Sequence, residues 1–181
     1  KNAVDSTDDA GCTPLLYACM TRQVSMARLL LEAGADPLLT DLNYGWSALH
    51  WAARHLDDLA LSVLCSRVSS VDIPDSLGRT PLYLACLAGR NNGETDAGAL
   101  RRCLLVLLAM QADPDTIPIP SSPSPAHMLA GGWLAEPLEV LLDAGADCHA
   151  TNPATDGYSA LHYACAALPL RPLVPPGTVS V

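Results

Sequence analysis

The side chains of this sequence with the widest chemical repertoire are its five histidines and seven cysteines. Such groups act as metal ligands, acid–base catalysts or nucleophiles when several of them converge on one point. The adjacent pair Cys148 and His149 has no second pair at the spacing that tetrahedral zinc sites use. The sequence also contains no C-x-x-C or H-E-x-x-H motif, no Gly-rich phosphate loop and no nucleophile elbow. We therefore expect no enzyme activity from these residues, and no catalytic residue, metal ion or cofactor.

The positions of these residues follow a repeat instead. The segment Thr80–Cys86 reads T-P-L-Y-L-A-C, and four similar segments begin at Thr13, Ser47, Ser124 and Ser159. Successive segments start 34, 33, 44 and 35 residues apart. Three histidines share the fourth position of the segment: His50, His127 and His162. Three cysteines share the seventh position, where alanine stands in the other two segments: Cys19, Cys86 and Cys165. We expect these cysteines to be small, buried core residues.

Each segment has the pattern of a helix that starts at its first residue. Thr or Ser is a favoured N-cap, and Pro is tolerated at the first helical position because the amide proton it lacks has no partner there. A second apolar block follows the segments, as in Ala27–Leu31 and Leu138–Leu142. Gly34 and Gly145 follow these two blocks and supply left-handed caps. One helix pair cannot bury its own apolar face, so we expect the pairs to stack.

A T-P-L-H-x-A segment that recurs about every 33 residues resembles the ankyrin repeat. The resemblance implies an all-α fold, an ankyrin-repeat α-solenoid of stacked helix-turn-helix repeats with finger loops. It also implies that the motif histidines bond to loop backbone and tie adjacent repeats together. Because Asn2–Asp5 looks like the tail of an earlier repeat, we expect a fragment of a larger ankyrin-repeat protein.

The repeats divide the chain into seven parts. Residues 1–12 are the end of a preceding repeat with its finger, and 13–40 and 41–74 are two regular repeats. Residues 75–116 are a repeat with an insertion between its helices, and 117–152 are a divergent repeat with a proline-rich finger. A terminal half repeat at 153–168 and a proline-rich tail at 169–181 complete the chain. We expect the insertion at 91–98 to be an exposed loop. In the fourth repeat, Gly131 and Gly132 are expected to shorten or loosen the inner helix. The prolines after residue 168 exclude a final outer helix, so the fifth repeat is either a half-repeat cap or was cut there.

Charge and hydropathy narrow the classes of partner. The formal net charge is −9, and Lys1 is the single lysine. Without a basic stripe, we expect no nucleic acid partner and no binding to anionic membranes. No apolar run approaches the roughly 18 residues that span a bilayer. An odd number of cysteines at small core positions is typical of a reducing compartment. We therefore expect an intracellular, cytoplasmic monomer, with the nucleus as the open alternative.

The resemblance places two rows of residues on the surface. The residue before each Thr or Ser lies on a finger, and the residue after each motif histidine position faces a concave groove. The finger row is Cys12, Trp46, Arg79, Pro123 and Tyr158. The groove row is Tyr17, Trp51, Leu84, Met128 and Tyr163. Trp, Tyr and Arg are enriched in interface hot spots. Packing between neighbouring helices is the open alternative for the groove row.

These rows indicate a protein-binding surface. Our candidate partner-binding residues are Tyr44, Trp46, Trp51, Arg54, His55, Arg79, Leu87 and Tyr158. We expect Trp46 to project from its finger, so that its removal would leave the core intact. The predicted function is that of a protein–protein interaction module, a scaffold or adaptor whose acidic surface suits a partner with basic residues. The alternative is a regulatory or substrate-recruiting ankyrin domain of a larger multidomain enzyme.

Overall fold

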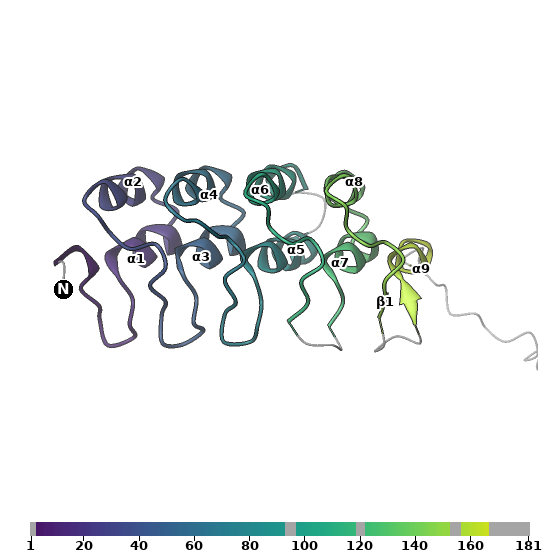
Figure 1. Cartoon of the computed structure of the whole chain (residues 1–181), viewed down its shortest axis with the longest axis horizontal. Helices are drawn as coiled ribbons and strands as arrows, with labels where there is room; N and C mark the ends of the chain where they lie inside the picture. Colours follow the sequence, from purple (N-terminus) through teal and green to yellow (C-terminus); the bar gives the residue numbers. More distant parts are fainter. Residues whose placement is uncertain (1–2, 93–96, 119–121, 153–156, 167–181) are drawn as a thin grey trace, which may run out of the picture.

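The computed structural model describes residues 3–92, 97–118, 122–152 and 157–166. Within these residues the helices form two rows, and the fingers extend from the inner row (Figure 1). The inner row consists of α1 (Pro14–Met20), α3 (Ala48–Arg54), α5 (Pro81–Asn92), α7 (Pro125–Gly131) and α9 (Ala160–Ala166). The outer row consists of α2 (Val24–Glu32), α4 (Asp58–Cys65), α6 (Ala97–Ala109) and α8 (Ala135–Asp143). The all-α solenoid that the sequence predicts is confirmed.

Short elements complete the described chain. A 3-10 turn, η1 (Ala3–Asp5), precedes the first finger. The last finger holds two short antiparallel strands, β1 (Thr151–Asn152) and β2 (Tyr158–Ser159). None of the helices in the described ranges is both long and apolar enough to cross a membrane.

The insertion between the third pair of helices is partly helical. Of the loop predicted at 91–98, residues 91–92 end α5 and residues 97–98 begin α6, so the insertion lengthens both helices. The rest of that loop at 93–96, part of the proline-rich finger at 119–121 and the tail at 169–181 lie outside the described residues.

Inner helices begin as the sequence predicts. The hydroxyl oxygen of Thr13 accepts a hydrogen bond from the Leu16 amide at 3.3 Å. Thr80 accepts one from the Tyr83 amide at the same distance. Each bond satisfies an amide that the first helical turn would leave without a partner. Such a cap contributes about 1 kcal/mol to the stability of its helix.

The motif histidines join consecutive repeats, as the resemblance implies. Nδ1 of His50 accepts a hydrogen bond from the Ser47 amide at 3.1 Å, so Nε2 carries the proton. That Nε2 donates to the Arg79 carbonyl of the next finger at 3.2 Å. Nε2 of His127 lies 3.0 Å from the Tyr158 carbonyl, one repeat further on. Burial lowers the pKa of His50, so its ring is neutral at pH 7.

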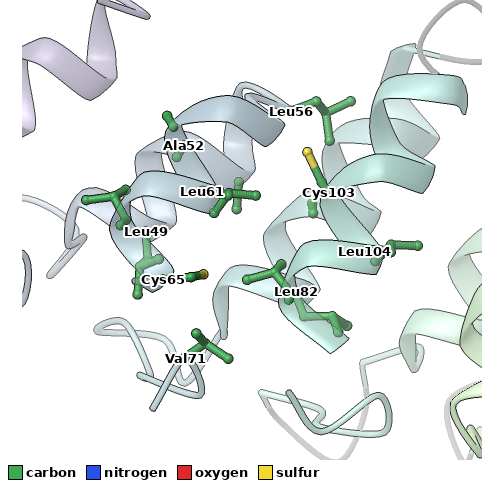
Figure 2. Packing of buried hydrophobic residues seen from close by; sticks show 14 of the residues in the cluster. Leu49, Ala52, Leu56, Leu61, Cys65, Val71, Leu82, Cys103 and Leu104 are labelled. Atoms are coloured by element: carbon green, nitrogen blue, oxygen red, sulfur yellow. The ribbon is translucent and has the colours of Figure 1, made fainter. Parts of the chain in front are cut away.

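The apolar core runs continuously through the stack. Both rows contribute leucines, such as Leu49 of α3 and Leu61 of α4, and the inner helices add small residues such as Ala52 and Cys86; all four are fully buried. In Figure 2, Leu61 of α4 and Cys103 of α6 point into the space between the two repeats. Burying one leucine side chain contributes about 1.5–3 kcal/mol. Since each repeat packs on its neighbours, this stabilisation is shared between consecutive repeats.

The structure corrects two expectations about the inner helices: that Gly131 and Gly132 shorten the fourth one, and that all three motif cysteines are buried. α7 spans seven residues, as α1 and α3 do. Gly131 and Gly132 do not shorten it, because they occupy the last helical position and the C-cap, where the chain leaves the helix in any case. Cys165 is exposed, whereas Cys19 and Cys86 are buried as expected. Among the described residues no outer helix follows α9, so nothing there covers the face that carries Cys165.

The fingers lie against one another. The Leu42 amide donates to the Ala10 carbonyl at 2.9 Å, and the Ser76 amide donates to the Tyr44 carbonyl at 3.1 Å. Gly45 permits this approach, because a Cβ atom there would lie 3.1 Å from the Ser76 nitrogen. Gly45 also has φ +67°, which other residues rarely adopt. The side chains of adjacent fingers therefore hold fixed positions relative to one another.

Candidate partner-binding surface

The third finger is organised by Asp75. Its Oδ1 accepts hydrogen bonds from the Leu77 and Arg79 amides, both at 2.8 Å. Its Oδ2 accepts from Nε of Arg79 at 2.7 Å and from Nε1 of Trp46, in the preceding finger, at 2.8 Å. Burial alone would raise the pKa of Asp75, but the bonds from Arg79 and Trp46 outweigh it and lower the pKa. The carboxylate therefore stays charged and holds two fingers together.

Trp46 is a structural residue, and the expectation that it projects into solvent is wrong. Its side chain is 7% exposed. The indole lies between Tyr44, at 5.0 Å between ring centroids, and Trp51, at 4.7 Å. Its N–H group is bonded to Asp75. The third finger lies close to the second, so it covers the Trp46 side chain.

Arg79 is also engaged inside the protein. Its guanidinium pairs with Asp75, with Nη2 and Oδ2 2.7 Å apart, and its Cζ lies 5.6 Å from the ring centroid of Trp46. The side chain is 19% exposed. Two nitrogens of the guanidinium contact one carboxylate oxygen and its plane lies near an aromatic ring, so Arg79 would lose these contacts if it turned to a partner. Arg79 therefore positions the site and presents little free charge.

Four of the predicted residues come together in one row across the second repeat. Tyr44, Trp46, Trp51 and His55 form an aromatic ladder from the tip of the second finger to the end of α3. Trp51 stacks on His55 with an interplanar angle of 19° and a centroid distance of 6.0 Å. The indole N–H of Trp51 donates to Oδ2 of Asp41 at 3.1 Å, which anchors the centre of the ladder to the finger.

The two ends of the ladder are accessible. Tyr44 is 51% exposed at the finger tip, while Trp51 and His55 are half-buried. Burial lowers the pKa of His55, and the charges of Arg54 and Arg22 lower it further. His55 is therefore neutral at pH 7 and offers a flat aromatic surface. Arg54, the remaining predicted residue of α3, is half-buried beside it.

The other two predicted residues lie elsewhere. Leu87 is half-buried in a cleft of 270 Å³ between the third and fourth fingers, where Arg79 also contributes. The cleft is lined by Leu77, Arg79, Tyr83, Leu87, Pro118 and Ser122. Tyr158 is 45% exposed on the last finger, stacked on His162 at 5.6 Å.

The groove row divides between contact and packing. Leu84 and Met128 are 1% and 2% exposed, so the packing alternative applies to both. Tyr17 is 48% exposed, and its hydroxyl donates to Oδ2 of Asp8 at 2.7 Å. Tyr17 of α1 is therefore bonded to an aspartate of the first finger, as Trp51 of α3 is bonded to an aspartate of the second.

Sequence reasoning missed two leucines at the finger tips. Leu42 is 77% exposed and Leu77 is 62% exposed, on adjacent fingers. Both follow a finger aspartate, Asp41 or Asp75, whose side chain caps the turn through backbone amides. A leucine in an otherwise polar turn was the available signal, because nothing buries a side chain at such a tip.

The described residues contain no group of three or more His, Cys, Asp or Glu side chains placed to hold a metal ion. Burial raises the pKa of Cys19 to about 12 and that of Cys65 to about 11. These thiols remain protonated at neutral pH and are poor nucleophiles or metal ligands. The large exposed side chains Leu42, Tyr44 and Leu77 of the second and third fingers are apolar or aromatic.

Comparison with known proteins agrees with the two-row architecture. A family model described as Ankyrin repeats (3 copies) matches residues 1–73. The chain is an ankyrin-repeat array. It is 32% identical over 165 residues to the B-cell lymphoma 3 protein homolog of Mus musculus, covering 89% of this chain and 34% of that protein. Ankyrin repeats are modules of protein–protein interaction rather than catalytic folds.

Two further relatives match the array at similar identity. The array is 31% identical over 156 residues to a Danio rerio protein named as the palmitoyltransferase ZDHHC13, covering 86% of this chain and 22% of that protein. It is also 31% identical over 182 residues to the nuclear factor NF-kappa-B p105 subunit of Gallus gallus, covering 84% of this chain and 18% of that protein. The array thus spans between 18% and 34% of the length of these three relatives.

Proposed function

We propose that this ankyrin array is a scaffold or adaptor that binds a partner protein through the second and third fingers and the adjoining inner helices. The aromatic ladder carries the proposal. The more exposed end of the ladder, Tyr44, lies two residues from Leu42 and is bonded to the finger that carries Leu77, and both leucines are exposed at the finger tips. Large apolar side chains on a rigid, preordered frame lose little entropy when they dock, which favours a binding role.

The proposed contacts fall into two groups. Leu42, Tyr44 and Leu77 meet the partner at the finger tips, and Trp51, His55 and Arg54 meet it along α3. The cleft beside Leu87 takes one apolar side chain of the partner. Trp46 and Arg79 act indirectly, because their bonds to Asp75 hold the two fingers in place. Tyr158 serves partners that extend to the last finger.

The partner's chemistry follows from charge. With a net charge of −9, the array attracts a partner that carries basic residues, and their binding weakens as salt rises. In the proposal the array acts as a monomer in the cytoplasm or nucleus, where its buried, unpaired thiols stay reduced. It supplies binding and no catalysis.

A titration with the partner tests the proposal. Chemical cross-linking and mass spectrometry with residues 1–181 identify the partner, which is then titrated against folded variants. Tyr44→Ala should weaken binding about tenfold or more, because the proposal makes this aromatic side chain a hot spot of the interface. Leu59→Ala is the matched control, because Leu59 is 65% exposed on α4, in the outer row. Equal losses for both variants, or none for Tyr44→Ala, would show that the fingers are not the binding surface.

The second candidate is a regulatory or substrate-recruiting domain of a larger multidomain enzyme. The relative named as a palmitoyltransferase, of which the array spans 22%, supports this alternative. In that case the same fingers would hold a substrate protein or a domain of the enzyme itself. Sequencing the complete transcript distinguishes the two, because an enzyme domain on the same polypeptide favours the second candidate.

A further inference from the structure

One arginine lies in the middle of an otherwise apolar row on the inner helices. Met20, Arg54 and Leu87 each lie seven residues after the Thr or Ser that precedes α1, α3 or α5, so they occupy equivalent positions. α3 packs against both α1 and α5, which places the three residues in one row. Leu87 lines the cleft beside the third and fourth fingers, so this position faces the groove. We call these three residues the Arg54 row.

Arg54 has no carboxylate partner in the part of the chain that the structure describes. The ion pairs found there belong to other arginines: Arg22, Arg79 and Arg102. Arg54 is half-buried, as are Met20 and Leu87 on either side of it. A charge that is partly removed from water interacts more strongly with an opposite charge than a fully exposed one does. A carboxylate that reaches Arg54 is therefore bound more strongly than at an exposed arginine.

A second cation lies near Arg54. The Arg22 side chain is 60% exposed, and its Nε lies 3.9 Å from Oδ2 of Asp57, a long distance for an ion pair. Oδ1 of Asp57 caps α4 by accepting a hydrogen bond from the Ala60 amide at 3.0 Å. Burial lowers the pKa of His55, the charges of Arg54 and Arg22 lower it further, and Asp57 opposes them. Two arginines and one aspartate thus surround this ring, so the local charge is positive in a chain of net charge −9.

The spacing of the Arg54 row defines which segment can follow it. Packed helices lie about 8–10 Å apart, and an extended chain advances about 3.3 Å per residue. Three residues of an extended segment therefore reach from one inner helix to the next. Residues i, i+3 and i+6 of such a segment contact Met20, Arg54 and Leu87 in turn. The third of them enters the 270 Å³ cleft that Leu87 lines.

We propose that the Arg54 row binds an extended segment of the partner protein with the pattern apolar-x-x-acidic-x-x-apolar, whose carboxylate pairs with Arg54. This inference rests on the function proposed above and adds the sequence of the segment that meets the inner helices. Basic residues of the partner meet the acidic surface elsewhere, because exposed charges more than about 8 Å apart are largely screened at physiological salt. Two arginines neutralise too few phosphates to hold a nucleic acid, so a carboxylate is the favoured anion.

A short peptide tests the pattern. The probe is acetyl-Leu-Ser-Ser-Glu-Ser-Ser-Leu-amide, titrated into isotope-labelled 1–181 and followed by NMR. The amide signals of Met20, Arg54 and Leu87 should shift and saturate. Replacing Glu of the peptide by Gln, or Arg54 by Gln, should each weaken binding about fivefold, the upper end of the range for exposed charge pairs. Arg67→Gln is the matched control, because Arg67 is an exposed arginine beyond the other end of α4 and its loss should leave binding unchanged.

Two further readouts show whether the carboxylate meets Arg54 itself. In a double-mutant cycle, the Gln peptide with Arg54→Gln should lose no more affinity than either change alone, because both remove the same pair. The pKa of His55 should rise when the Glu peptide binds and stay unchanged with the Gln peptide, because a nearby carboxylate favours the imidazolium form.

Four results would overturn the proposal. They are the absence of saturable shifts up to millimolar peptide, equal affinity for the Glu and Gln peptides, additive losses in the cycle, and equal shifts of the Arg54 row with inorganic phosphate. The comparison of the two peptides needs no protein variant, so it holds even if Arg54→Gln fails to fold. If the peptide fails while Tyr44→Ala still weakens partner binding, this inference is wrong and the function proposed for the fingers stands. If the peptide binds as expected and Tyr44→Ala has no effect, the reverse holds.

Discussion

Trp46 links the candidate surface to the stability of the array, and three substitutions at this end of the ladder can be ranked. Trp46→Ala empties a buried indole site and should cost about 3–5 kcal/mol. Trp46→Phe keeps most of the ring but removes the 2.8 Å bond to the charged Asp75, at a cost of about 2 kcal/mol. Tyr44→Ala removes a half-exposed ring that packs on Trp46 at an interplanar angle of 36°, and should cost about 1 kcal/mol.

Urea unfolding followed by far-ultraviolet circular dichroism measures this ranking, because the change at Trp46 also removes a fluorophore. With a slope of about 2–3 kcal/mol per molar urea, the midpoint should fall by about 1–2 M for Trp46→Ala and by less than 1 M for Trp46→Phe. The fit should allow for the separate unfolding of repeats. If Trp46→Ala is no less stable than Tyr44→Ala, the indole is not buried and the bond between the two fingers is not formed in solution.

Three other changes test the core and its ties. Burial lowers the pKa of His50 below its usual 6.5, so the stabilisation by neutral His50 is complete above pH 6.5 and falls as the pH drops below that value. The melting temperature of the protein should therefore fall between pH 7 and 5, and His50→Leu should reduce that fall. Iodoacetamide should alkylate Cys165 in the folded protein and Cys19 only in denaturant, as read by peptide mass spectrometry, since burial raises the pKa of Cys19 to about 12. Gly89→Ala should destabilise by about 1–3 kcal/mol in urea titrations despite the helix propensity of alanine, because the added methyl group would clash with Leu100 of α6.

The architecture was predictable because its signals are local. The caps at Thr13 and Thr80 depend on residues three positions further on, and both form as predicted. The repeat period then places each helix pair beside the next, since none can bury its own apolar face. The histidine ties followed from the resemblance, and His50 and His127 make them.

The candidate site was only partly predictable, because exposure at a finger depends on the finger of the next repeat. Trp46 is buried by a bond to Asp75, 29 residues away, and the same carboxylate restrains Arg79. Nothing in the sequence around Trp46 carries that information. Cys165 has the same motif position as Cys86 and yet is exposed, because burial there requires an outer helix that α9 lacks in the described chain. Local sequence therefore determined which residues are helical, and the stacking of repeats decided which side chains remain free to meet a partner.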